Sequence, residues 1–256
     1  MLALHSLSRR FGTRWAVRDL NATLLGGQVV GFLGPNGAGK TTTIKMIAGL
    51  LVPSTGSVLL DGIDVGVHPE EAKQRLAYIP DCPYVPERLS ARELLDYVAG
   101  LYGLPKDVAA SRGMAELARF GLKGRENDLL GTYSHGMRQR VLLAAALMRT
   151  PRVLLVDEPM VGLDPQGALD FRRLLARLAE EGRTIFLSTH SLAVAEELCD
   201  RIGVLDRGRL VALGDLAELR ARAAAIPSAS ELRDLNGSAT LESVFLQLIN
   251  ATEGEW

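Results

Sequence analysis

The sequence predicts an α/β fold with a mostly parallel central sheet, and two observations carry this prediction. Residues 29–33 and 153–156 are hydrophobic stretches typical of strands that are buried on both faces of a sheet. Each stretch is followed by a helical pattern, over residues 42–48 and over residues 171–178. Another hydrophobic stretch follows at 184–188. Strands that alternate with helices in this way form parallel sheets.

Composition indicates a globular protein without a membrane span of its own. The chain has 256 residues, 47% of them hydrophobic and 23% charged, enough for one large domain or two small ones. Its net charge of -1 argues against a strongly electrostatic nucleic-acid binder. We find neither a secretory signal nor the roughly 18 consecutive apolar residues of a membrane helix, so we expect any membrane role to be peripheral. Cys82 and Cys199 suggest neither a zinc site nor a disulfide framework.

The first part of the chain is predicted to be rich in strands. Apolar stretches separated by glycine-containing turns indicate strands at 2–7, 16–25 and 28–33. Two shorter strands are expected at 56–62, which runs into a turn, and at 76–80, which ends in a proline. The proline-containing residues that follow, 81–88, are expected to form a loop.

Residues 89–150 are predicted to form an inserted, all-helical subdomain. Apolar residues recur at helical spacing over 89–101 and 114–118, and a third helix is expected from about 136 to 148. Beyond this insertion, Asp164 and Pro165 mark the start of a helix. The tail from about 221 includes one apolar helical face and is expected to pack on the rest of the protein.

The clearest motif lies at residues 34–41. Gly34, Gly39, Lys40 and Thr41 match the phosphate-loop pattern G-x-x-x-x-G-K-[ST]. A strand, a glycine-rich turn and a helix N-terminus form an anion site, because backbone N–H groups converge and the helix dipole adds positive charge. We expect Lys40 to reach the β- and γ-phosphates and the Thr41 hydroxyl to bind Mg²⁺. The predicted nucleotide-binding positions in this loop are Gly34, Pro35, Asn36, Gly37, Ala38, Gly39, Lys40, Thr41 and Thr42.

Two adjacent acidic residues follow the strand at 153–156. Asp157 is expected to hold Mg²⁺ through water, and Glu158 to act as general base for an attacking water. The alternative is a pair of solvated acids without a role. The phosphate loop favours the functional interpretation, because it needs a partner of this type.

Together these motifs resemble the ATP-binding cassette family, the ATPase subunits of ABC transporters, over about residues 1–220. Residues 133–140 resemble its signature motif, 162–165 its D-loop, and His190 its switch histidine. The resemblance implies a P-loop NTPase core with a mostly parallel sheet, an N-terminal antiparallel β-subdomain and the helical insertion. Residues 221–256 would form a C-terminal helical tail.

The resemblance also implies roles for single residues. Phe11, which by itself reads as a core residue, matches the aromatic that stacks on adenine. Ser134 and Gly136 match signature positions that close on the γ-phosphate bound by a second cassette. The site would then be complete only in a head-to-tail dimer with two ATP molecules. Asp164 would link the two sites, and His190 would hold the attacking water.

The chain departs from the family pattern at two places. Asp81 stands where the family usually has glutamine; it could still bind the metal. It would add a third carboxylate near Asp157 and Glu158, which should raise at least one pKa unless Mg²⁺ compensates. His135 and Met137 replace the usual glycine and glutamine of the signature. His135 is either a pH-dependent charge at the dimer seam or ordinary surface variation.

The function that the resemblance implies is ATP binding and hydrolysis, coupled to transport through separate permease subunits at the cytoplasmic face of a membrane. The loop at 80–92 would receive a helix of the permease. The tail at 241–246 and the sequence at 79–81 resemble the exporter-like branch, and a second cassette, identical or different, would complete the dimer. The alternative is a soluble cassette ATPase that acts on DNA or ribosomes. Such relatives carry long coiled coils, zinc-binding cysteine pairs or two cassettes; since this sequence has none, we expect no nucleic-acid partner.

Overall fold

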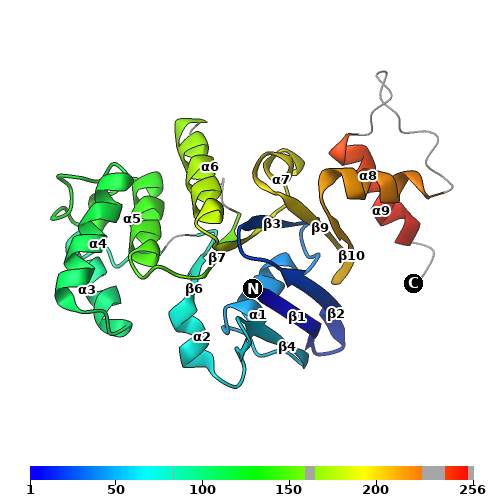
Figure 1. The fold of residues 1–256 in the computed structure, drawn as a ribbon, viewed down its shortest axis with the longest axis horizontal. Helices are drawn as coiled ribbons and strands as arrows, with labels where there is room; N and C mark the ends of the chain where they lie inside the picture. Colours follow the sequence, from blue (N-terminus) through cyan, green and yellow to red (C-terminus); the bar gives the residue numbers. More distant parts are fainter. Residues whose placement is uncertain (83, 159–164, 227–239, 253–256) are drawn as a thin grey trace.

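The computed structural model describes residues 1–82, 84–158, 165–226 and 240–252, and within them two sheets form the centre of the molecule (Figure 1). The smaller sheet has the order β2-β1-β4-β5 and is antiparallel. Its strands are β1 (Leu2–Phe11), β2 (Arg14–Leu24), β4 (Thr55–Leu60) and β5 (Ile63–Asp64). Strand β1 is longer than the predicted 2–7, so it carries Phe11 at its end.

The larger sheet is the predicted parallel one. Its order is β10-β9-β3-β8-β7-β6, and all neighbours are parallel except β9 and β10. The strands are β3 (Gln28–Leu33), β6 (Leu76–Ile79), β7 (Val153–Asp157), β8 (Thr184–Thr189), β9 (Arg201–Asp206) and β10 (Arg209–Gly214). The α/β fold class with a mostly parallel sheet and an antiparallel N-terminal sheet is therefore confirmed.

Strand register brings three chain segments to one edge of the larger sheet. Leu33 at the end of β3 pairs with Thr189 of β8, and Asp157 at the end of β7 pairs with Ser188. Because parallel strands end on the same side, the residues that follow β3, β7 and β8 lie close together at their carboxyl ends.

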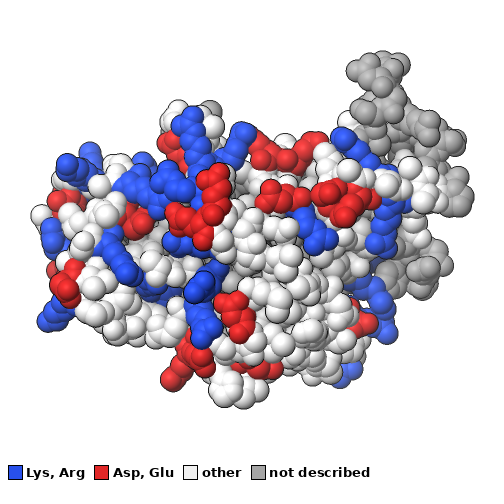
Figure 2. Space-filling view, in the orientation of Figure 1, with Lys and Arg blue, Asp and Glu red and all other residues white. Residues whose placement is uncertain are grey.

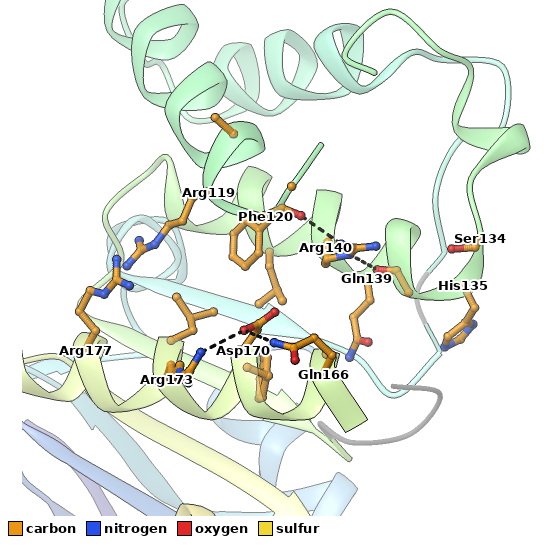
Figure 3. A pocket seen from close by; sticks show the side chains of 17 residues that line it. Arg119, Phe120, Ser134, His135, Gln139, Arg140, Gln166, Asp170, Arg173 and Arg177 are labelled. Carbon is orange, nitrogen blue, oxygen red and sulfur yellow. Dashed lines mark hydrogen bonds and ion pairs between the residues drawn. The ribbon is translucent and has the colours of Figure 1, made fainter. Parts of the chain in front are cut away.

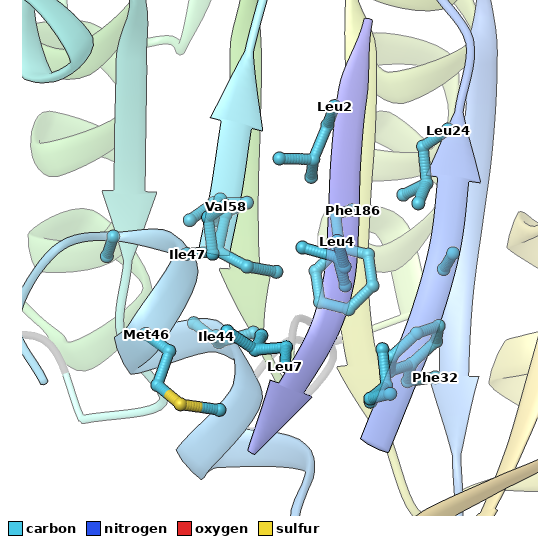
Figure 4. Close-up of a cluster of buried hydrophobic side chains, with 14 of the residues drawn as sticks. Leu2, Leu4, Leu7, Leu24, Phe32, Ile44, Met46, Ile47, Val58 and Phe186 are labelled. Atoms are coloured by element: carbon cyan, nitrogen blue, oxygen red, sulfur yellow. The ribbon is translucent and has the colours of Figure 1, made fainter. Parts of the chain in front are cut away.

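The two sheets are joined by a hydrophobic core that also contains α1 (Lys40–Ile47) (Figure 4). Leu4 and Leu7 of β1 face Phe32 and Phe186 of the larger sheet, and these two rings meet edge to face with centroids 4.6 Å apart. Burial of this layer fixes the position of the phosphate loop, which begins where β3 leaves the core.

Helices cover the other face of the larger sheet. The long α6 (Pro165–Glu180) buries Phe171, Leu174 and Leu178 against β7 and β8, and α7 (Leu192–Leu198) lies between β8 and β9 in sequence. The short α2 (Pro69–Arg75) was not predicted from the sequence. It buries only Ala72, so it carries no hydrophobic periodicity to detect.

The helical insertion has a core of its own. It contains α3 (Ala91–Leu101), α4 (Lys106–Arg119), a 3₁₀ turn η1 (Leu130–Thr132) and α5 (His135–Leu147). Ser90 and Glu93 form a capping box that begins α3. We call residues 89–150 the helical subdomain; it lies to the left of the larger sheet in Figure 1.

The C-terminal helices α8 (Leu216–Ala224) and α9 (Leu241–Thr252) pack beside β9 and β10. Leu219, Val244 and Leu248 share a hydrophobic cluster with Ile202 and Val204 of β9. Helix α8 continues across residue 220, where the sequence suggests a boundary. In the described part of the chain, no helix has both the length and the apolar composition to cross a membrane.

Candidate nucleotide-binding site

The phosphate loop connects β3 to α1 at the edge where the parallel strands end. Gly39 has a φ of 105°, and a side chain there would place its Cβ 2.5 Å from the carbonyl oxygen of Ala16, so only glycine fits. Lys40 is buried, and its Nζ donates hydrogen bonds to the carbonyl oxygens of Gly34 (2.7 Å) and Pro35 (3.1 Å). Burial lowers the pKa of Lys40, and the charges of Glu158 and Asp157 oppose this shift.

A cavity of about 480 Å³ opens beside this loop. The cavity brings together residues that are far apart in sequence: Phe11, Asn36, Gly37, Gly39, Lys40, Thr41, Thr42, Asp81 and Glu158 line it, along with Arg14 and Ala16. Phe11 is 50% exposed, so it is not the core residue that its apolar character alone suggests. The guanidinium of Arg9 lies 4.7 Å from the centre of its ring. An exposed ring at the mouth of such a cavity is able to stack on a nucleotide base.

The surroundings of the Asp157 carboxylate indicate that a cation fits this site. Its Oδ1 accepts a hydrogen bond from the Ser188 hydroxyl and lies 3.5 Å from the Thr41 hydroxyl. Its Oδ2 is buried and has no hydrogen-bond partner among the described residues. A buried carboxylate oxygen without a donor is costly unless a cation or water satisfies it.

The electrostatic environment of Asp157 agrees with that interpretation. Burial raises the pKa of Asp157, the hydrogen bonds from Ser188 and Thr41 oppose the shift, and the charges of Asp81 and Glu158 add to it. The same burial, with Asp157 and Asp81 nearby, raises the pKa of Tyr78 to about 12. The described residues contain no group of three or more His, Cys, Asp or Glu side chains that could hold a metal ion by themselves. A hard cation here would therefore need oxygen atoms from a nucleotide or from water as well.

Glu158 is held in place by the end of β8. Its backbone N–H donates to the carbonyl oxygen of Ser188 (3.0 Å), and its φ of 48° lies in the left-handed region, which is unusual for a residue with a side chain. One carboxylate oxygen accepts from the Thr189 hydroxyl (3.3 Å), and the other lies 2.9 Å from Nδ1 of His190. An ionised carboxylate only accepts hydrogen bonds, so in a contact with ionised Glu158 the Nδ1 of His190 is the donor.

Ser134 and Gly136, which the resemblance assigns to a γ-phosphate bound by a second cassette, do not line this cavity. Ser134 and Gly136 are at the start of α5 in the helical subdomain, where the exposed Ser134 hydroxyl caps the helix by accepting from the Met137 N–H (3.3 Å). They line another cavity, shown in Figure 3. The predicted D-loop residue Asp164 lies outside the described residues.

Sequence reasoning missed several residues of the site, including Ser188 and Arg14. Ser188 is fully buried and hydrogen-bonded to Asp157, and only the register of β7 and β8 reveals this contact. Arg14 lines the nucleotide cavity, and its guanidinium lies 3.9 Å from where a Cβ of Gly37 would be. It makes no ion pair with any residue that the structure describes. Its position three residues after Phe11 is the only signal in the sequence.

Comparisons with known proteins identify the family. A family model described as ABC transporter matches residues 17–161. The linearmycin resistance ATP-binding protein LnrL of Bacillus subtilis (strain 168) is 36% identical over 222 residues, which cover 87% of this chain and 71% of LnrL.

Solved structures agree with the sequence comparison. A structure described as the ATP binding subunit of an ABC transporter has a TM-score of 0.87 and 31% identity, covering 97% of this chain and 99% of that one. The dimeric ATP-binding cassette MJ0796, in a post-hydrolysis state bound to ADP and Pi, has a TM-score of 0.75 and 25% identity, covering 84% and 99%. With its phosphate loop, buried carboxylate and paired Glu158 and His190, this chain belongs to the ABC transporter family as an ATP-binding subunit that hydrolyses ATP.

Proposed function

We propose that this chain is one half of an ATPase dimer that powers export through separate permease subunits at the cytoplasmic face of a membrane. One observation carries the proposal. The cavity gathers Lys40, Thr41 and Glu158, whereas Ser134 and Gly136 lie in another subdomain and do not line that cavity. The cavity alone suits nucleotide binding, and the accessible N-terminus of α5 suits contact with a second molecule.

Within the cavity, the loop of residues 34–42 binds the phosphates. Its backbone N–H groups and the N-terminus of α1 face the anion, and Lys40 exchanges its contacts with loop carbonyls for the β- and γ-phosphates. Phe11 stacks on the adenine. Thr41, Asp157 and Asp81 are the residues that would hold Mg²⁺, which when bound neutralises phosphate charge.

The chain's own side chains then prepare the attacking water. Glu158 accepts a proton from it as general base, because its carboxylate is largely buried and reaches the cavity. His190, hydrogen-bonded to Glu158 and 58% exposed, positions that water and the γ-phosphate. The contact between the two side chains aligns base and histidine before substrate arrives.

A second cassette completes the site. Ser134 offers a hydroxyl and Gly136 a backbone N–H at the N-terminus of α5, both suited to a γ-phosphate bound by the partner. The related cassette MJ0796 is dimeric with ADP and Pi bound, which supports this arrangement. Asp164 is proposed to link the two sites across the dimer.

Transport coupling is assigned to the loop at 80–92. This loop runs from Asp81 at the cavity to Val85, which is buried in the core of the helical subdomain, and it presents Tyr84 with 85% of its surface exposed. A permease helix that contacts Tyr84 would therefore be connected with the nucleotide site. The name of LnrL, a resistance protein, supports outward transport.

Co-purification tests the proposal. Glu158→Gln protein, isolated with ATP from detergent-solubilised membranes of its own cells, is expected to bring a multi-spanning membrane protein with it. The matched preparation of Lys40→Ala, which should bind ATP much more weakly, is expected to lose ATP-dependent dimers in gel filtration. Recovery of ribosomes, DNA or soluble proteins alone would contradict the transport assignment and leave the ATPase assignment intact.

A further inference from the structure

A second cavity, of about 790 Å³, opens between the helical subdomain and α6 and shares no lining residue with the nucleotide cavity (Figure 3). Its walls are the last turn of α4, the first half of α5 and residues 166–177 of α6. Phe120, Leu143, Phe171 and Leu174 give it an apolar floor. We call it the arginine cleft, because Arg119, Arg140, Arg173 and Arg177 also line it.

The charge of the arginine cleft is strongly unbalanced. Four arginines line it with a single acidic residue, Asp170. Arg173 lies 3.7 Å from Asp170, but both side chains are more than half exposed, so this pair is weak. Arg140 donates to the carbonyl oxygens of Phe120 and Gly136, both at 3.2 Å, and these neutral acceptors leave its charge uncancelled. The surface view shows basic side chains gathered over α4, α5 and α6 (Figure 2).

The excess of positive charge is greatest at one end of the arginine cleft. Arg119 of α4 and Arg177 of α6 point toward one another, at the opposite end from Ser134 and His135 (Figure 3). Arg119 has an acidic neighbour, Glu116, at 3.4 Å, whereas Arg177 makes no ion pair with any described residue. Two guanidinium groups that face each other repel, and an anion between them would remove that repulsion.

We propose that the arginine cleft binds a small organic anion. Its carboxylate or phosphate groups lie between Arg119 and Arg177, since a planar guanidinium binds either group in a bidentate manner. Its apolar part lies on Phe120 and Phe171. Because α4 belongs to the helical subdomain and α6 covers the central sheet, the bound anion connects the two and holds them in one relative position.

A fluorescent anion with an aromatic body, 8-anilino-1-naphthalenesulfonate, is the probe for this site. It is titrated into the full chain without nucleotide, and its fluorescence is expected to rise. Arg177→Ala should raise the Kd of the probe about tenfold, the effect of losing one charged hydrogen bond. The matched control is Arg222→Ala on the distant α8; Arg222 is also exposed and without an ion pair among the described residues, and its loss should change nothing.

Competition identifies the anionic group. Citrate and pyrophosphate are added to the bound probe, and the better competitor shows whether carboxylates or phosphates are preferred. Equal probe affinity in wild type, Arg177→Ala and the charge-reversed Arg177→Glu would overturn the proposal. The proposal would also be overturned if Lys40→Ala abolished probe binding and Arg177→Ala did not, because the probe would then occupy the nucleotide cavity. Failure of both competitors to displace the probe would overturn it as well.

Discussion

The proposed catalytic machinery has two halves, one at the carboxyl edge of the central sheet and one on the helical subdomain. A single chain completes the first half but not the second. At the carboxyl edge of the central sheet, Asp157 is hydrogen-bonded to Ser188 and Glu158 contacts His190, so folding alone sets their positions. On the helical subdomain, Ser134 is exposed and faces no residue of the nucleotide cavity. We therefore expect the first half to bind nucleotide by itself and the second half to need another molecule. Substitutions should therefore separate binding from hydrolysis.

The largest effect is expected from Glu158→Gln. The amide keeps the shape of the side chain but cannot accept the proton, so ATP hydrolysis should fall by roughly 10²–10⁴-fold while ATP binding persists. Phosphate release and equilibrium binding of a fluorescent ATP analogue measure the two separately. Glu180→Gln, at the exposed end of α6, is the control. Near-normal turnover in Glu158→Gln would show that another group is the base.

Lys40→Ala should impair the half at the central sheet, which one chain completes and which binds the nucleotide. Loss of the buried ammonium is expected to weaken ATP binding about 10²-fold, since a charge-assisted contact is lost in a site with little water. Lys45→Ala, on an exposed position of the same helix, should leave the affinity unchanged. Unchanged affinity in Lys40→Ala, measured by calorimetry, would contradict the phosphate-loop assignment.

Ser134→Ala should affect only the half on the helical subdomain, which is expected to act on ATP bound by a second chain. Hydrolysis is expected to fall about tenfold because the γ-phosphate loses one hydrogen bond, while ATP binding by the single chain stays the same. Since Ser134 also caps α5, Ser90→Ala at the cap of α3 controls for the loss of a helix cap. A parallel loss of ATP affinity in dilute, monomeric Ser134→Ala would place this serine in its own chain's site.

The smallest effect is expected from Arg14→Ala. The Arg14 guanidinium lies beside the phosphate loop and has no ion pair among the described residues, so it should add a modest attraction for phosphates. In the variant the Kd for ATP should therefore rise about fivefold, and the Kd for adenosine should not change. Arg18→Ala, exposed on the same strand and outside the cavity, is the control. Equal effects on ATP and adenosine would show that Arg14 shapes the cavity rather than binding phosphate.

Sequence reasoning found the residues whose signal is local and missed those whose role depends on neighbours. The phosphate loop, the helical subdomain and α6 each leave a pattern within a short window. Ser188 leaves none and Arg14 only its spacing from Phe11, because a serine or an arginine in a strand is ordinary until the fold places it. Phe11 was open to two interpretations until its exposure was known.

Sequence alone was enough to predict the α/β class and the phosphate loop, because glycine conformation, helix starts and hydrophobic periodicity are set by near neighbours along the chain. The resemblance to the ATP-binding cassette family rests instead on the order of its motifs. The three-dimensional fold was needed to show that Phe11, Asp81 and Glu158 line one cavity and that Arg119 and Arg177 line another. These encounters depend on strand order and on helices packed across long sequence separations. The hydrophobic burial that creates them is non-directional, so no local pattern records which residues it brings together.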